Sequence, residues 1–163
     1  MPPAPTTSSL IDFAIDRKQL QLIKKRFLNI NEQRWARTHT ALSERQQLLL
    51  ELLPLLLHVN HPVLPGYVNA DTPAGLCGYK PSKAQLKNAK RLARSFRFQP
   101  LNNRQRSIHA LFLMGSVGTI GQNPSSDLDF WLCFDPNLNE IQQQALRNKC
   151  DKLSRWGRSL GLE

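Results

Sequence analysis

The sequence predicts an α+β domain, in which a helical N-terminal part is followed by a core of strand, turn, strand and helix. Three observations predict this class. Apolar residues recur at helical spacing through much of residues 16–60. Two apolar runs, residues 108–113 and 127–134, flank a segment of small residues and have the composition of strands. Helical periodicity then returns over residues 139–160.

The N-terminal part is predicted to begin as a tail and to continue as a helix. Residues 1–15 are rich in Pro, Ser and Thr and are expected to be disordered. Asp16 is a suitable N-terminal cap for the helix that follows. The apolar positions of this helix recur at helical spacing: Leu20, Ile23, Phe27 and Ile30.

A second helix is predicted over the Leu-rich run 48–59, with Ser43 and Gln46 as its capping box. The run is too short to cross a membrane and contains Glu51 and Pro54, so we expect a buried helix rather than a membrane span. The helical segment therefore occupies residues 16–60.

Residues 61–81 are predicted to form a long loop, because prolines and glycines punctuate the whole stretch. Loops of this length in compact domains are often functional or disordered. Packing roles are favoured here for His61 and Tyr67. His58 and His61 have no third ligand at metal-site spacing, so a metal site is not favoured there.

A strongly basic helix is predicted after Ser82, which is its cap. The chain carries a net charge of +10, and no acidic residue occurs between Asp71 and Asp127. The basic positions of the helix form a stripe: Lys83, Lys87, Lys90, Arg91 and Arg94. Its other side is apolar: Leu86, Ala89, Ala93 and Phe96. The stripe could attract polyphosphate or nucleic acid, or it could be a solvated face, and the second interpretation is favoured.

The segment 108–134 is the most informative about function. Its first strand ends in Met-Gly-Ser, and after about ten residues Asp-Leu-Asp opens the second strand. Side chains alternate faces along a strand, so Asp127 and Asp129 are expected on one face. Adjacent carboxylates repel each other unless a cation lies between them, and a turn at Gly115 and Ser116 offers N–H groups to phosphate oxygens. The pattern predicts a Mg²⁺-dependent nucleotide site, because a carboxylate inside an apolar strand would otherwise be costly to bury.

This order of parts resembles the nucleotidyltransferase superfamily that includes DNA polymerase beta. More narrowly, residues 114–133 resemble the active-site segment of class I adenylate cyclases, the enterobacterial-type enzymes that make cyclic AMP. Three further stretches resemble the same family in the same order: Leu52 to Tyr67, Thr72 to Leu76, and Lys149 to Glu163. The resemblance implies a nucleotidyltransferase-type α/β core over residues 82–163.

The resemblance also implies a reaction and residue roles. ATP would be converted to 3′,5′-cyclic AMP and pyrophosphate by attack of the ribose 3′-hydroxyl on the α-phosphorus. The residues that would bind the phosphates, at a turn opening a helix, are Gly115, Ser116 and Ser126. Asp127 and Asp129 would be catalytic and would hold two Mg²⁺ ions, which Mn²⁺ could replace. Superfamily members have a third metal-binding carboxylate, and Glu163 is its candidate.

Members of this family are several times longer than 163 residues. The resemblance therefore implies an N-terminal fragment of the catalytic region, truncated at its third strand. Its implied partners are ATP, the regulatory region of the longer chain and a sugar-transport phosphoprotein.

Two other functions are compatible with the sequence. A different nucleotidyltransferase could move a nucleoside monophosphate to RNA, protein or a small molecule with the same parts. A non-enzymatic basic module could bind nucleic acid, although the collinear family segments do not favour a nucleic-acid partner.

The remaining composition suggests a cytoplasmic protein without a signal peptide. The three cysteines, Cys77, Cys133 and Cys150, lack metal or redox spacing and are expected to be reduced, with Cys133 in the core. The three tryptophans, Trp35, Trp131 and Trp156, are expected at core or boundary positions.

Overall fold

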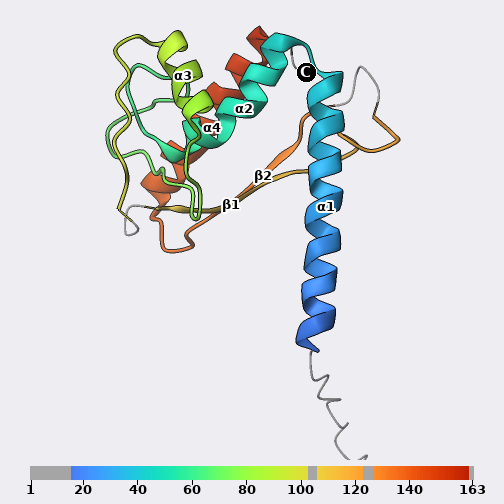
Figure 1. Ribbon diagram of the computed structural model, residues 1–163. Coiled ribbons are helices and arrows are strands. Elements are labelled where there is room, and N and C mark those ends of the chain that lie inside the picture. Colours follow the sequence, from blue (N-terminus) through green and yellow to red (C-terminus); the bar gives the residue numbers. More distant parts are fainter. Residues whose placement is uncertain (1–15, 103–105, 123–126, 162–163) are drawn as a thin grey trace, which may run out of the picture. The chain divides into compact units, whose positions relative to one another are not determined.

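The computed structural model describes residues 16–102, 106–122 and 127–161 (Figure 1). The chain forms two compact units, residues 1–33 and 34–163. The elements, in chain order, are α1 (Arg17–Ala41), α2 (Glu44–His58), α3 (Lys83–Leu92), β1 (Ile108–Leu113), β2 (Phe130–Phe134) and α4 (Glu140–Ser159). The predicted α+β class is confirmed, with helix predominating. The nucleotidyltransferase core stays a prediction, and the predicted tail at 1–15 lies outside the described residues.

The first unit contains the N-terminal part of α1. The backbone N–H of Lys18 donates to Asp16 Oδ1 at 2.9 Å, so the predicted cap is confirmed. The apolar stripe predicted for this helix is exposed throughout: Leu20, Ile23, Phe27 and Ile30.

Helix α2 is the buried helix of the second unit. Gln46 Oε1 accepts from the N–H of Ser43 at 2.9 Å, as the predicted capping box requires. All seven leucines from Leu49 to Leu57 are buried. Pro54 cannot donate a backbone hydrogen bond, yet the helix continues to its last residue, because its leucines pack on all sides.

Residues 61–81 contain no helix and no extended strand, as predicted, but they are tied to the sheet. The N–H of Ile108 donates to Gly75 O at 3.0 Å, and the N–H of Cys77 donates to Ile108 O at 2.8 Å. Leu76 thereby forms a parallel bridge with Ile108 at the edge of the sheet. The loop consequently fixes the start of the strand that leads to the glycine turn.

Two further helices begin at capping boxes. Ser82 Oγ accepts from the N–H of Gln85 at 3.1 Å, which confirms the predicted start of α3. Asn139 Oδ1 accepts from the N–H of Gln142 at 2.9 Å at the start of α4. Helix α3 ends at Leu92, so Arg94 of the predicted basic stripe lies beyond it. Ala93 and Phe96 of the predicted apolar side also lie beyond it.

Strands β1 and β2 form an antiparallel pair with a bulge near its start. Ile108 pairs with Phe134 but Ala110 pairs with Cys133, so His109 is the extra residue. Side chains of a strand alternate faces, and the extra residue lets both Ile108 and Leu111 face the core.

The core lies between the sheet and the helices α2 and α4. Helix α2 contacts α3, α4 and β1 (Figure 1). The buried cluster contains residues from each of these elements, among them Leu55, Leu56, Ala89, Ile108, Leu146 and Leu153. Within the described part of the chain, no helix has the length and apolar character needed to cross a bilayer.

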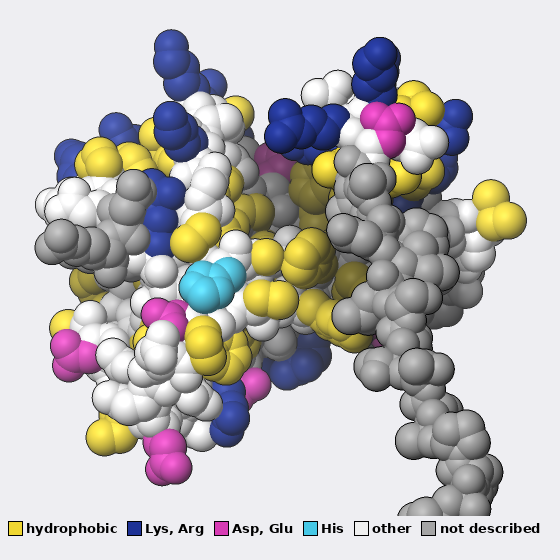
Figure 2. All heavy atoms as spheres, turned by 90° about the horizontal axis from the view of Figure 1, so that it is seen from below, with side chains coloured by type: hydrophobic (Ala, Val, Ile, Leu, Met, Phe, Trp, Pro, Cys, Tyr) yellow, Lys and Arg dark blue, Asp and Glu magenta, His cyan; other side chains and the backbone are white. Residues whose placement is uncertain are grey.

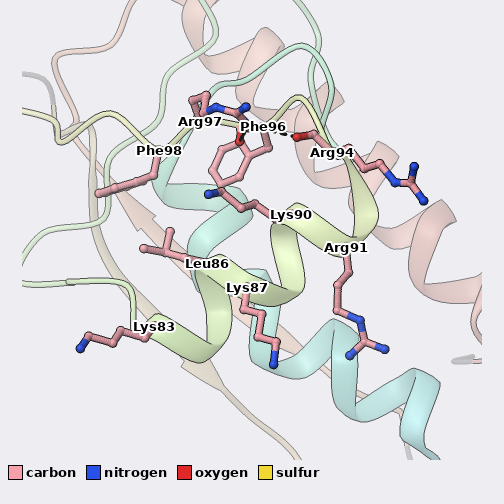
Figure 3. Close-up of a pocket in the computed structure, with 9 residues that line it drawn as sticks. All are labelled: Lys83, Leu86, Lys87, Lys90, Arg91, Arg94, Phe96, Arg97 and Phe98. Atoms are coloured by element: carbon pink, nitrogen blue, oxygen red, sulfur yellow. Dashed lines mark hydrogen bonds between the residues drawn. The ribbon is translucent and has the colours of Figure 1, made fainter.

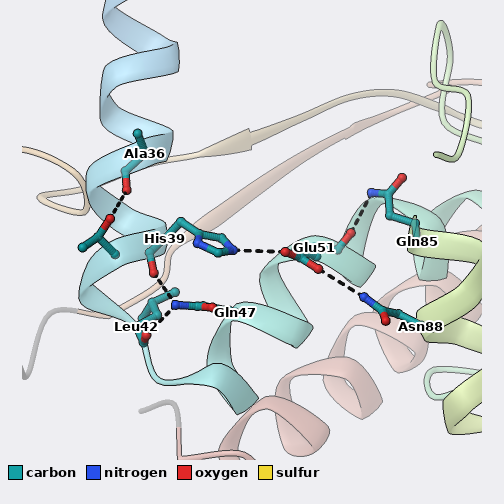
Figure 4. A network of polar contacts seen from close by, with 8 residues as sticks. Ala36, His39, Leu42, Gln47, Glu51, Gln85 and Asn88 are labelled. Atoms are coloured by element: carbon teal, nitrogen blue, oxygen red, sulfur yellow. Dashed lines mark hydrogen bonds and ion pairs between the residues drawn. The ribbon is translucent and has the colours of Figure 1, made fainter. Parts of the chain in front are cut away.

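A polar network joins the end of α1 to α2 and α3 (Figure 4). His39 Nε2 lies 3.0 Å from Glu51 Oε1, and the other oxygen of that carboxylate accepts from Asn88 Nδ2 at 3.3 Å. Gln85 Nε2 donates to the backbone oxygen of Glu51 at 2.7 Å. Glu51, which interrupts the Leu-rich run, therefore links three helices.

Candidate functional site

The segment after β1 is a glycine loop, residues 115–118. Gly115 and Gly118 have φ values of 78° and 71°, in the left-handed region that favours glycine. Positive φ at two positions is incompatible with a right-handed helix, so residues 115–122 form successive turns. The expectation that this turn opens a helix is therefore wrong, and no helix dipole contributes to anion binding there.

The carboxylate of Asp129 lies against this loop. A Cβ atom placed on Gly115 would lie 3.2 Å from Asp129 Oδ2, closer than ordinary contact. The N–H of Met114 donates to Asp129 O at 2.8 Å, which holds the two chain segments in register. The structure therefore brings two of the predicted site residues, Gly115 and Asp129, together.

Both aspartates precede β2 rather than lying inside it, which corrects the prediction of a strand carrying them. The strand begins at Phe130, and both Asp127 and Asp129 are exposed. Exposure alternates residue by residue from 127 to 134, which puts the two carboxylates on the same outward face. Because they are exposed, the argument from the cost of burying a carboxylate does not apply. Their position at the entrance of the strand is explained by access to water.

Two other predicted site residues, Ser126 and Glu163, lie outside the described residues. Among residues 16–102, 106–122 and 127–161, no group of three or more His, Cys, Asp or Glu side chains is arranged to hold a metal ion. Asp127 and Asp129 supply two carboxylates, the hard oxygen ligands that Mg²⁺ takes together with water and substrate phosphates. In donor chemistry, the residues present fit that ion.

The C-terminal end of α1 contacts the glycine loop, which the sequence did not indicate. Arg34 Nη2 donates to Gly115 O at 3.1 Å and to Val117 O at 3.0 Å. Arg37 Nε donates to Gly118 O at 2.6 Å. From the sequence alone, an arginine on a helix that contacts a distant loop cannot be distinguished from one that is exposed to solvent. The spacing of three residues between Arg34 and Arg37, which puts them on one helix face, was the only available signal.

The outward face of the sheet carries two exposed aromatic rings. Phe112 is 47% exposed and Trp131, its cross-strand partner, is 63% exposed. Figure 2, which views the molecule from below relative to Figure 1, shows that hydrophobic side chains are exposed at the surface among polar and charged ones. Trp131 is therefore not a core residue, and Cys133, also exposed, is not one either. Both lie on the outward face because they alternate with core-facing neighbours.

The histidines near the end of α2 have structural roles. His58 is buried, and its Nδ1 accepts from the N–H of Leu76 at 3.1 Å. Burial lowers the pKa of His58, so the ring is neutral at neutral pH. The ring of His61 packs edge-on against Phe96, with centroids 5.1 Å apart.

The basic stripe borders a groove of about 940 Å³ at α3 that shares no residue with the carboxylate pair. Six cations line it: Lys83, Lys87, Lys90, Arg91, Arg94 and Arg97. Figure 3 shows that Lys83, Lys87 and Arg94 point in different directions instead of converging on one point. This arrangement is typical of a solvated basic face.

The second unit is thus an α+β domain in which the carboxylate of Asp129 lies against a glycine loop. Comparison with known families is specific: the model of the adenylate cyclase N-terminal (NT) domain matches residues 19–163. The chain belongs to the adenylate cyclase N-terminal domain family.

Curated relatives carry the same name. The adenylate cyclase of Escherichia coli (strain K12) is 36% identical over 146 residues, which cover 88% of this chain and 17% of that protein. The adenylate cyclase of Salmonella typhimurium has the same identity and coverage, and that of Proteus mirabilis is 31% identical over 147 residues. The chain thus spans only 17% of the length of these relatives. No solved structure matches it.

Proposed function

We propose that this chain supplies the phosphate-binding loop and two catalytic carboxylates of an adenylate cyclase, which converts ATP to 3′,5′-cyclic AMP and pyrophosphate. One observation carries the proposal: the carboxylate of Asp129 lies against Gly115, within the segment that matches the adenylate cyclase domain. The name of the relatives supports the choice of reaction, and the contact between Asp129 and Gly115 supports the choice of site.

In this mechanism the ribose 3′-oxygen attacks the α-phosphorus of the same molecule. The new bond joins O3′ to the α-phosphorus, the bond from that phosphorus to the bridging oxygen breaks, and pyrophosphate departs. The 3′-hydroxyl proton passes to water. Because attack is intramolecular, holding the nucleotide in the reactive conformation supplies much of the acceleration, and no side-chain nucleophile is needed.

The residues of the chain have two tasks. Backbone N–H groups of the turn at Gly115 and Ser116 would bind phosphate oxygens. Asp127 and Asp129 would hold Mg²⁺, with Ser126 as a further phosphate contact and Glu163 as a third carboxylate. When bound, Mg²⁺ would neutralise phosphate charge and lower the pKa of the 3′-hydroxyl.

The test uses ATP labelled at the α-phosphate, with Mg²⁺ and with Mn²⁺ or EDTA in its place. Two proteins are compared: this chain alone, and the E. coli relative with its matched region replaced by residues 19–163. We expect cyclic AMP from the chimera. Asp127→Asn and Asp129→Asn should each lower its turnover about a thousandfold or more, because several kcal/mol of charge stabilisation are lost.

Asp151→Asn is the matched control, since Asp151 is an exposed carboxylate on α4 outside the site. Full activity of either site variant would contradict the assignment. Label transferred to RNA, protein or a small molecule would support the other nucleotidyltransferase function. Oligonucleotide binding without any ATP binding would favour the basic module.

A further inference from the structure

We propose that Arg34 and Arg37, at the end of α1, are positioning residues that lock the peptide groups of loop 115–118 in an anion-binding orientation. The identity of the anion, MgATP, rests on the proposed function. The lock itself rests on hydrogen bonds, on burial and on the glycines of the loop.

The first observation is that all four carbonyl oxygens of the loop accept hydrogen bonds from the protein. Arg34 takes those of Gly115 and Val117, and Arg37 takes that of Gly118. The remaining one, Ser116 O, accepts from the N–H of Thr119 at 3.0 Å and from its hydroxyl. Three of the four carbonyls are therefore held by two guanidinium groups.

The three arginine-held peptide groups differ in what their N–H ends do. The N–H of Gly118 donates to Gln122 Oε1 at 2.7 Å and that of Thr119 donates to Ser116 O at 3.0 Å, so the bonds to Val117 O and Gly118 O hold the frame of the loop. The bond from Arg34 to Gly115 O orients the N–H of Ser116.

A carbonyl oxygen is the negative end of the peptide dipole and repels a phosphate, whereas the N–H end attracts it. Glycine adopts φ values of either sign at little cost, so the peptide groups beside Gly115 and Gly118 could reverse readily. Charge-assisted bonds from arginine are stronger than neutral ones and oppose that reversal.

Packing fixes the helix close enough for these bonds to form. Val117 is 1% exposed, and Thr38 is fully buried with its Oγ1 2.9 Å from Arg34 O. A Cβ atom placed on Gly118 would lie only 2.3 Å from Arg34 O. The loop and the helix therefore touch through backbone, and the guanidinium groups have a short and fixed reach.

The test compares Arg34→Met, Arg37→Met and the double variant with the unaltered chain. Arg45→Met is the control, because Arg45 is an exposed arginine on α2 with none of these contacts. Two quantities are measured: amide hydrogen exchange of the peptide spanning residues 114–122, and the Kd for MgATP and for Mg²⁺ with tripolyphosphate. Added guanidinium ion tests rescue, and far-ultraviolet circular dichroism checks that each variant is folded.

We expect the double variant to exchange faster in the loop and to bind both anions about tenfold or more weakly, as expected for lost charged hydrogen bonds. Guanidinium ion should restore part of the affinity. Arg34→Lys should lie between the unaltered chain and Arg34→Met, because an ammonium keeps the charge but lacks the planar fork. The control should match the unaltered chain.

Unchanged loop exchange in the double variant would overturn the lock. If the double variant exchanges faster in the loop but keeps its affinity for both anions, the lock has no role in anion binding. The same conclusion follows if the unaltered chain binds neither anion. If the unaltered chain binds tripolyphosphate but not MgATP, and the variants bind it more weakly, the proposed cyclase function fails while the lock is supported.

Discussion

At the scale of single residues, Lys149 is a charged side chain buried without a carboxylate partner among the described residues. It is 1% exposed, and its Nζ donates to Val59 O, at the end of α2, at 2.9 Å. Burial lowers its pKa from 10.5 to about 8, which corresponds to a penalty on the order of 3 kcal/mol for the charged form. The amine links α4 to α2 at an electrostatic cost.

This cost makes stability depend on pH. Between pH 8 and 10.5 Lys149 is mostly neutral in the folded chain and protonated in the unfolded one. The unfolded state then binds more protons, so the free energy of unfolding rises with pH through that window. Burial raises the pKa of Tyr79 to about 12, which lowers stability above pH 10. Burial also raises the pKa of the Cys150 thiol from 9.0, which opposes the rise in the upper part of the window. We therefore predict a net rise that is steepest between pH 8 and 9, measured by urea unfolding.

Lys149→Met removes the titrating group while keeping the length of the side chain. It should flatten the rise between pH 8 and 9, whatever its effect at neutral pH. Lys152→Met is the control, because Lys152 is exposed and donates to Tyr67 O. A rise of the same slope in Lys149→Met would show that another group causes it.

At the scale of elements, the contact of the glycine loop with α1 predicts an unequal cost for two glycine substitutions. Gly118 and Gly78 both have positive φ values, 71° and 67°. Gly118 approaches the backbone of Arg34, whereas a Cβ on Gly78 would meet nothing within 4 Å. Gly78→Ala should cost about 1 kcal/mol for the left-handed conformation alone.

Gly118→Ala should cost about 3 kcal/mol or more, because the new methyl group overlaps backbone atoms that cannot move freely. Urea unfolding measures the loss in unfolding free energy of each variant. The difference between the two losses gives the contribution of the helix–loop contact, because both variants carry the same penalty for a positive φ. Equal losses in the two variants would mean that the loop does not approach α1 closely in solution.

Local elements could be predicted because their signals lie within a few residues of each other. The cap at Ser82 is one example, and α3 begins directly after it as predicted. The Pro/Gly-rich loop is another, because residues 61–81 contain no helix and no extended strand. Which side chains of β2 face the core was harder to predict. All five residues from Phe130 to Phe134 are apolar, so the sequence shows no alternation of polar and apolar residues there. The prediction therefore placed Cys133 in the core and Trp131 at a core or boundary position, and both are exposed.

The candidate site was predictable only in part, for a similar reason. Residue type and spacing indicated Gly115 and Asp129, and the structure brings them together. The bond from Arg34 to Gly115 spans 81 residues of chain, and no local pattern encodes a contact at that separation. Periodicity indicates that a helix exists, but it does not indicate which loop the helix will contact.

At the scale of the whole molecule, the chain carries a net charge of +10. The groove at α3 contains cations that point apart (Figure 3). We therefore predict that single-stranded DNA binds weakly, without sequence preference and with strong salt dependence. Lys87→Glu with Arg94→Glu should weaken binding as much as Lys24→Glu with Arg26→Glu on α1, because only the number of charges matters.

Fluorescence anisotropy with a labelled oligonucleotide over a salt series measures both double variants against the unaltered chain. A loss confined to the α3 variant would contradict a diffuse charge effect and would identify the groove as a true binding surface. ATP affinity should not change in either variant, since none of these residues lies at the carboxylate pair.

The bulge at His109 has a consequence for how chain length can vary in this family. Removing the extra residue would leave Ile108 and Ala110 adjacent in a regular strand, with each still on its present face. Removing a residue between 110 and 113 would instead move the side chains that precede the deletion to the opposite face of the sheet. Position 109 is therefore where natural or engineered deletions can enter β1 without disturbing the distance from Gly115 to Asp129.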